Sequence, residues 1–235
     1  MKKSQIFIVD DHPIFRKGLV QLINEEQDME VCGEAEDVFT ATKKIRNAAP
    51  DLIIADITLK DTSGLELIKY INDNNMNIPV LVLSMHDEKI FAERALKTGA
   101  KGYIMKQEMS GNVTAAIRHV LSGKVYVSEA INERILSSIT GRGTETSSPE
   151  IDKDPSTILT DRELEIFRMM GRGYKRNEIG NALNLNVNTI GTYRERIKEK
   201  LNLSSSNELM TRAILWVRKV EEQEIIEEDK EKEDK

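Results

Sequence analysis

Carboxylate, hydroxyl and ammonium side chains each follow a short apolar run in the first half of this chain. Asp10 and Asp11 come after the first run, Asp56 after the third, Ser84 after the fourth and Lys106 after the fifth. Clustered carboxylates raise each other's pKa unless a cation lies among them, and carboxylate oxygens are ligands that Mg²⁺ prefers, usually beside a phosphate. A hydroxyl and an ammonium bind phosphoryl oxygens. Each residue alone is more often a turn former, but the five together predict phosphoryl chemistry.

The hydrophobic pattern of the first 125 residues predicts the elements that position this set. Five short runs rich in β-branched residues are mostly continuous in hydrophobicity, as is typical of parallel strands buried on both faces. They cover residues 6–9, 31–35, 52–55, 80–83 and 102–104. Amphipathic helical patterns lie between them, so we expect an α/β domain with a five-stranded doubly wound parallel sheet of flavodoxin-like type. Such sheets bind ligands at the carboxyl ends of their strands.

The rest of the chain has a different organisation. Residues 140–157 are polar, contain two Gly and two Pro and show no periodicity, so we expect a linker. Helical patterns cover residues 110–121, 129–139, 162–170, 175–183, 187–201 and 207–220. The predicted organisation is a first domain at 1–139, a linker at 140–157, a small all-α helix-turn-helix domain at 158–220 and an acidic tail at 221–235.

Charge separates the same parts. Residues 1–155 carry 19 Lys and Arg against 24 Asp and Glu, residues 156–220 carry 12 against 7, and residues 221–235 carry 3 against 9. A basic module behind an acidic domain indicates that nucleic acid contacts the second domain only. We interpret the tail as a solvated helix extension, with competition against DNA for the basic helix as the alternative.

Composition excludes several classes of protein. With 39% hydrophobic and 31% charged residues, the chain is too apolar for a wholly disordered protein. No run approaches the roughly 18 apolar residues of a membrane span, and the N-terminus lacks a signal-peptide core, so we expect a soluble, cytoplasmic protein with no membrane partner. One cysteine, Cys32, and three scattered histidines predict neither a disulfide nor a zinc site.

The helical pattern at 187–201 has the two faces of a DNA-recognition helix, with Asn186 as its expected N-cap. Ile190, Tyr193, Ile197 and Leu201 share one face at 100° per residue. The opposite face shows short polar groups flanked by long cations, namely Asn188, Gly191, Thr192 and Glu195 beside Arg194, Arg196 and Lys198. The cations would bind phosphates, while Asn188, Glu195 and Thr192 would meet adenine, cytosine N4 and a thymine methyl. The alternative is a solvated amphipathic helix.

Long ordered motifs then point to a family. Four segments resemble the receiver domain of bacterial two-component response regulators: IFIVDDHPIFRKGL, DLIIADITLKDTSGLELIK, PVLVLSMHDE and ALKTGAKGYIMK. A fifth, LTDRELEIFRMMGRGYKRNEIGNALNLNVNTIGTYRERIKEKLNL, resembles a LuxR-type helix-turn-helix. Together they resemble the NarL/FixJ class over residues 4–139 and 158–218.

This resemblance implies a role for each matching residue. Asp56 would be the phosphoacceptor, phosphorylated by a sensor histidine kinase, and Mg²⁺ would be held by Asp10, Asp11, Asp56 and the main-chain carbonyl of Thr58. Ser84 and Lys106 would bind the phosphoryl oxygens, and Tyr103 would turn inward when Ser84 moves. The expected output is transcription regulation by a homodimer on double-stranded DNA, with RNA polymerase as a further partner, rather than enzymatic turnover.

The chain departs from the family pattern at several positions. Leu59 and Lys60 replace the usual Met-Pro, Gln107 replaces the Pro after Lys106, and Met85 replaces a small residue. Because the family often carries Lys at Gly191 and Glu195, a different operator is expected.

Three other residues invite a functional interpretation. His12 is interpreted as a helix starter rather than a metal ligand, His86 as a loop residue, and Cys32 as a core residue rather than a redox sensor.

Two rival functions stay open. One is an Mg²⁺-dependent phosphatase with Asp56 as nucleophile, although Thr58 stands where a general acid would be needed two residues later. The other is an adaptor whose helical module binds a protein rather than DNA. Steep salt dependence of duplex binding would favour DNA.

Overall fold

The computed structural model describes residues 2–59, 62–85, 88–129, 131–133, 154–183 and 185–233, with the backbone alone at 88–90, 108–111 and 223–233. The chain divides into two compact units, residues 1–146 and 147–235. Among the described residues, no helix combines the length and the apolar character needed to span a membrane.

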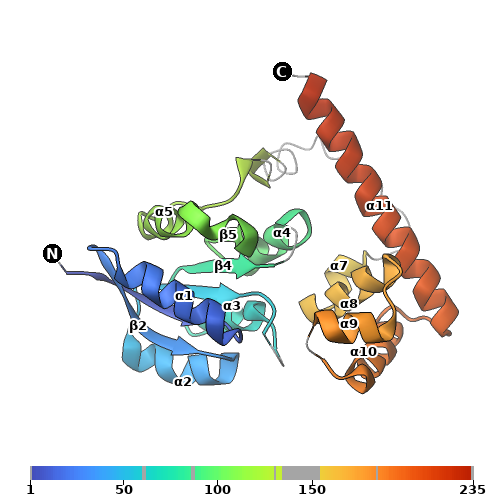
Figure 1. Ribbon diagram of the computed structural model, residues 1–235, viewed down its shortest axis with the longest axis horizontal. Coiled ribbons are helices and arrows are strands. Elements are labelled where there is room, and N and C mark those ends of the chain that lie inside the picture. Colours follow the sequence, from blue (N-terminus) through green and yellow to red (C-terminus); the bar gives the residue numbers. More distant parts are fainter. Residues whose placement is uncertain are drawn as a thin grey trace. The chain divides into compact units, whose positions relative to one another are not determined.

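The first unit is built on a five-stranded parallel sheet in the order β2-β1-β3-β4-β5 (Figure 1). Its strands are β1 (Ser4–Val9), β2 (Met29–Ala35), β3 (Leu52–Asp56), β4 (Val80–Ser84) and β5 (Gly102–Met105). Val9 pairs with Ala55 in the register of β1 and β3, so these two strands end side by side. The predicted doubly wound sheet is confirmed, and each strand covers its predicted run.

Helices α1 (Pro13–Asn24), α2 (Val38–Ala48), α3 (Gly64–Asp73), α4 (Glu88–Thr98) and α5 (Met109–Leu121) connect and cover the strands. Local sequence starts them: Pro13 occupies the first turn of α1, and the side chain of Asp37 accepts a hydrogen bond from the Thr40 amide at α2. A short 3₁₀ turn, η1 (Lys106–Glu108), links β5 to α5.

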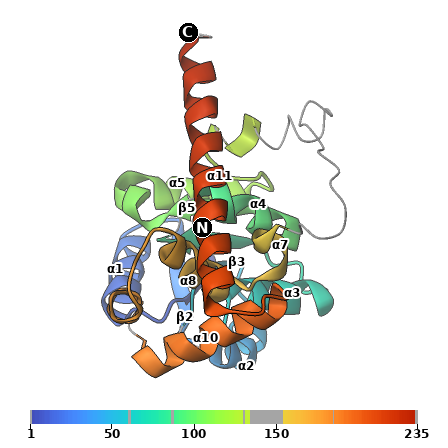
Figure 2. The same ribbon diagram turned by 90° about the vertical axis from the view of Figure 1, so that its right-hand side faces the viewer.

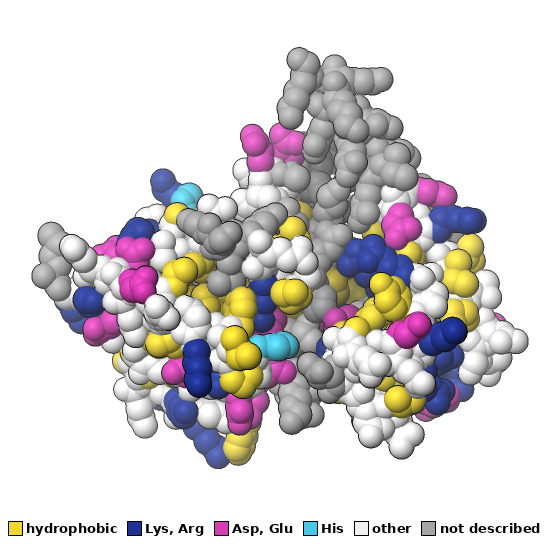
Figure 3. All heavy atoms as spheres, in the orientation of Figure 1, with side chains coloured by type: hydrophobic (Ala, Val, Ile, Leu, Met, Phe, Trp, Pro, Cys, Tyr) yellow, Lys and Arg dark blue, Asp and Glu magenta, His cyan; other side chains and the backbone are white. Residues whose placement is uncertain are grey.

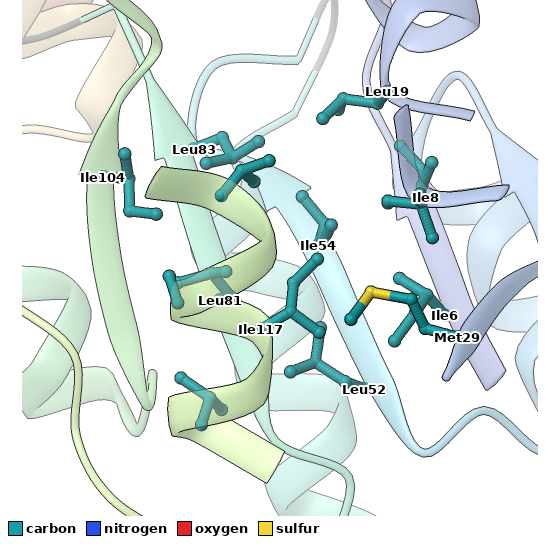
Figure 4. Close-up of a cluster of buried hydrophobic side chains, with 14 residues drawn as sticks. Ile6, Ile8, Leu19, Met29, Leu52, Ile54, Leu81, Leu83, Ile104 and Ile117 are labelled. Carbon is teal, nitrogen blue, oxygen red and sulfur yellow. The ribbon is translucent and has the colours of Figure 1, made fainter. Parts of the chain in front are cut away.

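Alternate residues of the central strands fill the core beneath α1 and α5 (Figure 4). The cluster consists of Ile6, Ile8, Leu19, Ile23, Met29, Leu52, Ile54, Leu81, Leu83, Ile104, Val113, Ala116, Ile117 and Val120. The intervening strand residues, such as Phe7 and Ile53, are equally buried on the opposite face. The sheet is therefore buried on both sides, and polar chemistry is confined to the strand ends.

The second unit is helical, with α7 (Pro155–Ile158), α8 (Asp161–Gly171), α9 (Arg176–Ala182), α10 (Val187–Lys200) and α11 (Ser206–Glu233). Phe167 of α8 and Trp216 of α11 pack with their ring centres 5.9 Å apart. Gly171 permits a close crossing of α8 and α11, because a Cβ there would lie 2.4 Å from the Ala213 carbonyl oxygen. The last helix is longer than the predicted 207–220, since its backbone stays helical to Glu233 (Figure 2).

One boundary differs from the prediction. The linker was expected to extend to residue 157, but Asp154 caps α7 by accepting from the Ser156 amide, and Pro155 is buried in its first turn. The Pro that indicated a linker is thus a helix-starting residue. Asp154 also accepts a 3.1 Å hydrogen bond from the Trp216 indole, which ties α7 to the helical unit.

Other predictions fall outside the described residues. Residues 129 and 131–133 are helical as expected, whereas 134–139 and the expected linker residues 140–153 are not described. The same holds for Lys60 and His86.

Candidate functional site

The ends of β1, β3 and β5 bring two carboxylates and an ammonium into contact. Lys106, directly after β5, donates 2.6 Å hydrogen bonds from Nζ to Asp10 Oδ2 and to Asp56 Oδ2. All three side chains are buried, with relative exposures of 8%, 2% and 3% in that order. The predicted convergence of Asp10, Asp56 and Lys106 is therefore what the structure shows.

Burial sets the electrostatics of this cluster. Burial raises the pKa of Asp56 to about 6; the Lys106 ammonium opposes the shift and Asp10 adds to it. Burial would lower the pKa of Lys106, but the Asp56 and Asp10 carboxylates outweigh it and the net direction is upward. Lys106 is therefore cationic at neutral pH. Above pH 6, Asp56 is predominantly a carboxylate, the form that can act as a nucleophile.

Backbone hydrogen bonds orient both carboxylates. The Thr58 amide donates to Asp56 Oδ1 at 3.1 Å, and the His12 amide donates to Asp10 Oδ1 at 2.7 Å. The loop after β3 returns to α3 at Gly64, whose amide donates to the Ile57 carbonyl at 2.9 Å. A Cβ on Gly64 would lie 2.1 Å from the Asp56 carbonyl oxygen, so only a glycine lets α3 begin against the end of β3.

Atoms suited to binding a divalent cation gather in and beside this cluster. Asp10, Asp11, His12 and Asp56 each offer one ligand atom, and these atoms lie within 4.8 Å of one another. Asp11 Oδ1 is shielded from solvent and accepts no hydrogen bond from the residues described, although His12 Nδ1 lies 2.8 Å away. A carboxylate oxygen without a donor fits a cation better than it fits a closed hydrogen-bond network. The donor set is therefore compatible with Mg²⁺.

His12 is the residue that sequence reasoning undervalued here. It is the N-cap position of α1, as its interpretation as a helix starter requires, but its side chain makes no capping hydrogen bond. Instead Nδ1 lies 3.4 Å from Asp10 Oδ1 and 3.9 Å from Asp56 Oδ2, with the side chain 54% exposed. Its position next to Asp10 and Asp11 was the available signal.

Ser84 and Tyr103 complete the receiver residues singled out from the sequence. Ser84 is the last residue of β4, is fully buried and pairs with Met105 of β5. Tyr103 is 1% exposed, so its ring already has the inward orientation that the family resemblance associates with a displaced Ser84. Met85 is 59% exposed beside them. All peptide bonds of the described residues are trans, including Lys106–Gln107.

The second unit contains a helix-turn-helix formed by α9 and α10. The Leu185 amide donates to the Gly180 carbonyl at 2.8 Å across the turn. The side chain of Asn186 caps α10 by accepting from the Asn188 amide at 2.9 Å, so the predicted N-cap is confirmed. Ile190 and Ile197 are buried, which leaves the opposite face of α10 for a ligand.

The predicted DNA-contacting residues of α10 differ in their exposure and in their contacts within the protein. Asn188, Thr192, Glu195 and Arg196 are exposed, and Gly191, Arg194 and Lys198 are half-buried. Lys198 donates to Glu195 three residues earlier, so these two charges neutralise each other in this structure. The Arg196 guanidinium lies 5.9 Å from the centre of the Tyr193 ring. Over the helical unit, Figure 3 shows Lys and Arg side chains interspersed with acidic and apolar ones.

A charged connection that the sequence analysis did not identify supports α10 from α8. Thr160 and Glu163 form a reciprocal capping box, with the Glu163 carboxylate accepting from the Thr160 amide at 2.8 Å. Lys200, at the end of α10, donates to the same carboxylate at 2.7 Å. The spacing of Thr160 and Glu163 was a readable signal; the contact with Lys200 depends on the fold.

Comparisons with known proteins agree with both halves of this geometry. Residues 6–118 match the response regulator receiver domain family, and residues 157–213 match the luxR family of bacterial regulatory proteins. The Oxygen regulatory protein NreC of Staphylococcus epidermidis is 32% identical over 211 residues, which cover 89% of this chain and 96% of that protein. Response regulator UvrY of Escherichia coli is 32% identical over 210 residues, which cover 89% and 93%.

Solved structures agree as well. A LuxR-family two-component response regulator from Aurantimonas is 31% identical with a TM-score of 0.55, over 59% of this chain and 99% of that one. RcsB of Salmonella enterica, solved on a promoter, shares the fold at 23% identity with a TM-score of 0.53, over 89% of this chain and 97% of that one. The chain therefore belongs to the NarL/FixJ family of two-component response regulators, which act as DNA-binding transcription regulators.

Proposed function

We propose that Asp56 is the phosphoacceptor and takes a phosphoryl group from a sensor histidine kinase. The observation that carries this proposal is the buried contact of Lys106 with both Asp10 and Asp56 at 2.6 Å. An ammonium in that position stabilises the charge that accumulates on phosphoryl oxygens. In the transfer, an Asp56 carboxylate oxygen forms the new bond to phosphorus as the phosphorus–nitrogen bond of the kinase histidine breaks.

Asp10, Asp11 and Asp56, with the main-chain carbonyl of Thr58, would hold Mg²⁺. The bound ion offsets the negative charge of the phosphoryl group. The chain's own contribution is orientation: the Thr58 amide holds one Asp56 oxygen, so the other oxygen is presented to the donor. Lys106 donates a hydrogen bond to Asp56 Oδ2. On phosphorylation, its ammonium would donate to a phosphoryl oxygen instead.

Ser84 would then bind a second phosphoryl oxygen. Its displacement would be coupled to Tyr103 one strand away, since β4 and β5 are paired along this edge. Both side chains are buried, so a small movement changes packing at the surface of β5. A new dianion can bias such a two-state element only through contacts that differ between its states.

The output would be binding of a homodimer to double-stranded DNA in the cytoplasm, with α10 in the major groove and RNA polymerase as a further partner. Exposed Asn188 and Thr192 at the start of α10 would face the bases, and Arg194, Arg196 and Lys198 the phosphates. The RcsB complex shows this fold on promoter DNA in the presence of a phosphomimetic. Its dimers on DNA support the same arrangement here.

Phosphorylation of the full-length chain tests the proposal. The protein is incubated with Mg²⁺ and acetyl phosphate, and its intact mass and elution from a sizing column are recorded. Wild type should gain one phosphoryl group and elute as a dimer, and Asp56→Asn should do neither. Asp73→Asn, which changes an exposed acid at the end of α3, is the matched control and should behave as wild type. A phosphoryl adduct on Asp56→Asn would place the acceptor elsewhere.

A further inference from the structure

The start of α9 places an arginine over the recognition helix. Arg176 is the first residue of α9, and its side chain is exposed. A Cβ built on Gly191 of α10 would lie 3.7 Å from Arg176 Nη1 and 3.9 Å from its Cζ. These are ordinary contact distances, so the guanidinium rests on α10 where the side chain of residue 191 would begin. Any side chain longer than alanine at 191 would occupy the same space.

A second guanidinium lies beside the first. Arg194 follows Gly191 by three residues and therefore projects from the same side of α10. Burial lowers the pKa of Arg194, and the charge of Arg176 lowers it further. Two like charges are thus held close together on a partly desolvated surface, which is unfavourable unless an anion joins them.

The nearby protein groups do not supply that anion. Within the residues that the structure describes, neither guanidinium donates a hydrogen bond or forms an ion pair. Glu195 is the acid whose charge acts on Arg194, but its carboxylate already accepts from Lys198. Glu178 of α9, two residues after Arg176, accepts from the Lys175 amide at 2.7 Å.

We propose that Arg176 and Arg194 form a clamp for a single backbone phosphate of duplex DNA, with Gly191 leaving the space through which Arg176 reaches across α10. Guanidinium groups bind phosphate through paired donors, and two of them can share its oxygens. The proposal rests on the DNA-binding function and adds a contact from α9. It also reassigns Gly191, which the sequence analysis placed among the base-facing residues: its role is to admit Arg176.

A double-mutant cycle on the full-length chain tests the clamp. Fluorescence anisotropy measures binding to a random-sequence duplex across a salt series for wild type, Arg176→Ala, Arg194→Ala and the double variant. Arg218→Ala removes an exposed arginine of α11 and is the control of equal charge. Gly191→Leu tests the space, because its side chain would extend beyond a Cβ that already lies 3.7 Å from the Arg176 guanidinium, and it should weaken binding as Arg176→Ala does.

Each single clamp variant should weaken binding about tenfold at low salt and reduce the slope of log K against log salt by up to about one. The double variant should lose much less than the product of the two, because both arginines hold one phosphate. A purely structural role for Arg176 would move the unfolding midpoint of the Trp216 signal and leave the salt slope unchanged.

Arg176→Ala that binds like Arg218→Ala overturns the clamp, as does a double variant whose loss equals the product of the single losses. Wild type that binds no duplex at low salt refutes the DNA-binding function itself.

Discussion

Replacing Asp56 by Asn should stabilise the first unit. Burial raises the pKa of Asp56 from 3.8 to about 6, and each unit of pKa corresponds to about 1.4 kcal/mol. Folding with an ionised Asp56 at pH 7.5 therefore costs up to about 3 kcal/mol relative to folding with a neutral side chain. Asn has the shape of the neutral acid and cannot ionise. We expect Asp56→Asn to raise the free energy of unfolding by an amount approaching this value.

The free energy of unfolding of the wild type should depend on pH. Because the folded pKa lies above the unfolded one, the folded wild type binds more protons between pH 3.8 and about 6. Its stability therefore falls as pH rises through that window. The advantage of Asp56→Asn should be absent below pH 3.8, grow between pH 4 and 6, and be constant above about pH 7. Asp73→Asn, at an exposed position, should show no comparable rise.

The assay uses the position of the single tryptophan. Trp216 lies in the second unit, so its emission follows that unit, while far-UV circular dichroism follows both. Urea unfolding with both signals, in EDTA, isolates the transition of the first unit. Added Mg²⁺ should narrow the difference by stabilising the wild type. An Asp56→Asn variant that is less stable at pH 7.5, or whose advantage is the same at pH 4 and pH 7, would refute the electrostatic reasoning.

Three further changes test other parts of the chain. Gly64→Ala would put a Cβ 2.1 Å from the carbonyl oxygen that ends β3, so we expect loss of phosphorylation and about 2 kcal/mol or more of destabilisation in thermal unfolding. Its control, Gly18→Ala, has open space in α1 and should gain about 0.5–1 kcal/mol in the same measurement. Glu163→Gln should cost the second unit about 1–2 kcal/mol, measured by indole emission. Burial opposes ionisation of Glu163, but its ammonium and amide partners lower its pKa below the ordinary 4.5, so this loss is full above pH 4.5 and disappears as pH falls through the folded pKa. Deleting residues 221–235 should leave indole-monitored stability and duplex affinity at 0.15 M salt unchanged, because the α11 backbone stays helical to Glu233, about 40 Å along the axis from Ser206, and charges are screened beyond a Debye length of about 8 Å. A tenfold gain in affinity would show that the tail covers the DNA surface.

The receiver site was predictable because its residues all follow strands of one parallel sheet. Once β1, β3, β4 and β5 are recognised as parallel, their carboxyl ends form one edge, and the residues after each strand must meet there. Asp10, Asp56, Ser84 and Lys106 follow directly from that rule. His12 does not, since whether a side chain after the strand turns toward the acids or caps α1 depends on a rotamer that no hydrophobic pattern specifies.

The helical unit was less predictable because its contacts are set by crossing helices. The apolar face and the N-cap of α10 follow from periodicity, but the contact of Arg176 with Gly191 depends on how α9 lies across α10. Likewise, a proline such as Pro155 usually indicates a turn, but here it lies in the first turn of α7. Asp154 caps that helix and accepts a hydrogen bond from Trp216, a contact that depends on the fold. The contacts of long side chains at helix crossings therefore cannot be predicted from the sequence pattern.

The continuous α11 bears on the two interpretations of the acidic tail. Nε of Arg172, directly after α8, lies 3.3 Å from Oε1 of Glu221. The acidic segment therefore begins where α11 passes the end of α8. At about 1.5 Å per residue, Glu221 is roughly 22 Å along the helix from Ser206, and the helical turns to Glu233 add nearly 20 Å more. α11 begins a short turn after α10 ends, so the backbone of residues 221–233 forms the end of α11 that is farther from this turn. To cover α10, the tail would have to unwind and reverse direction, losing the backbone hydrogen bonds of three turns. A solvated helical extension requires no such rearrangement and is the interpretation that this geometry favours.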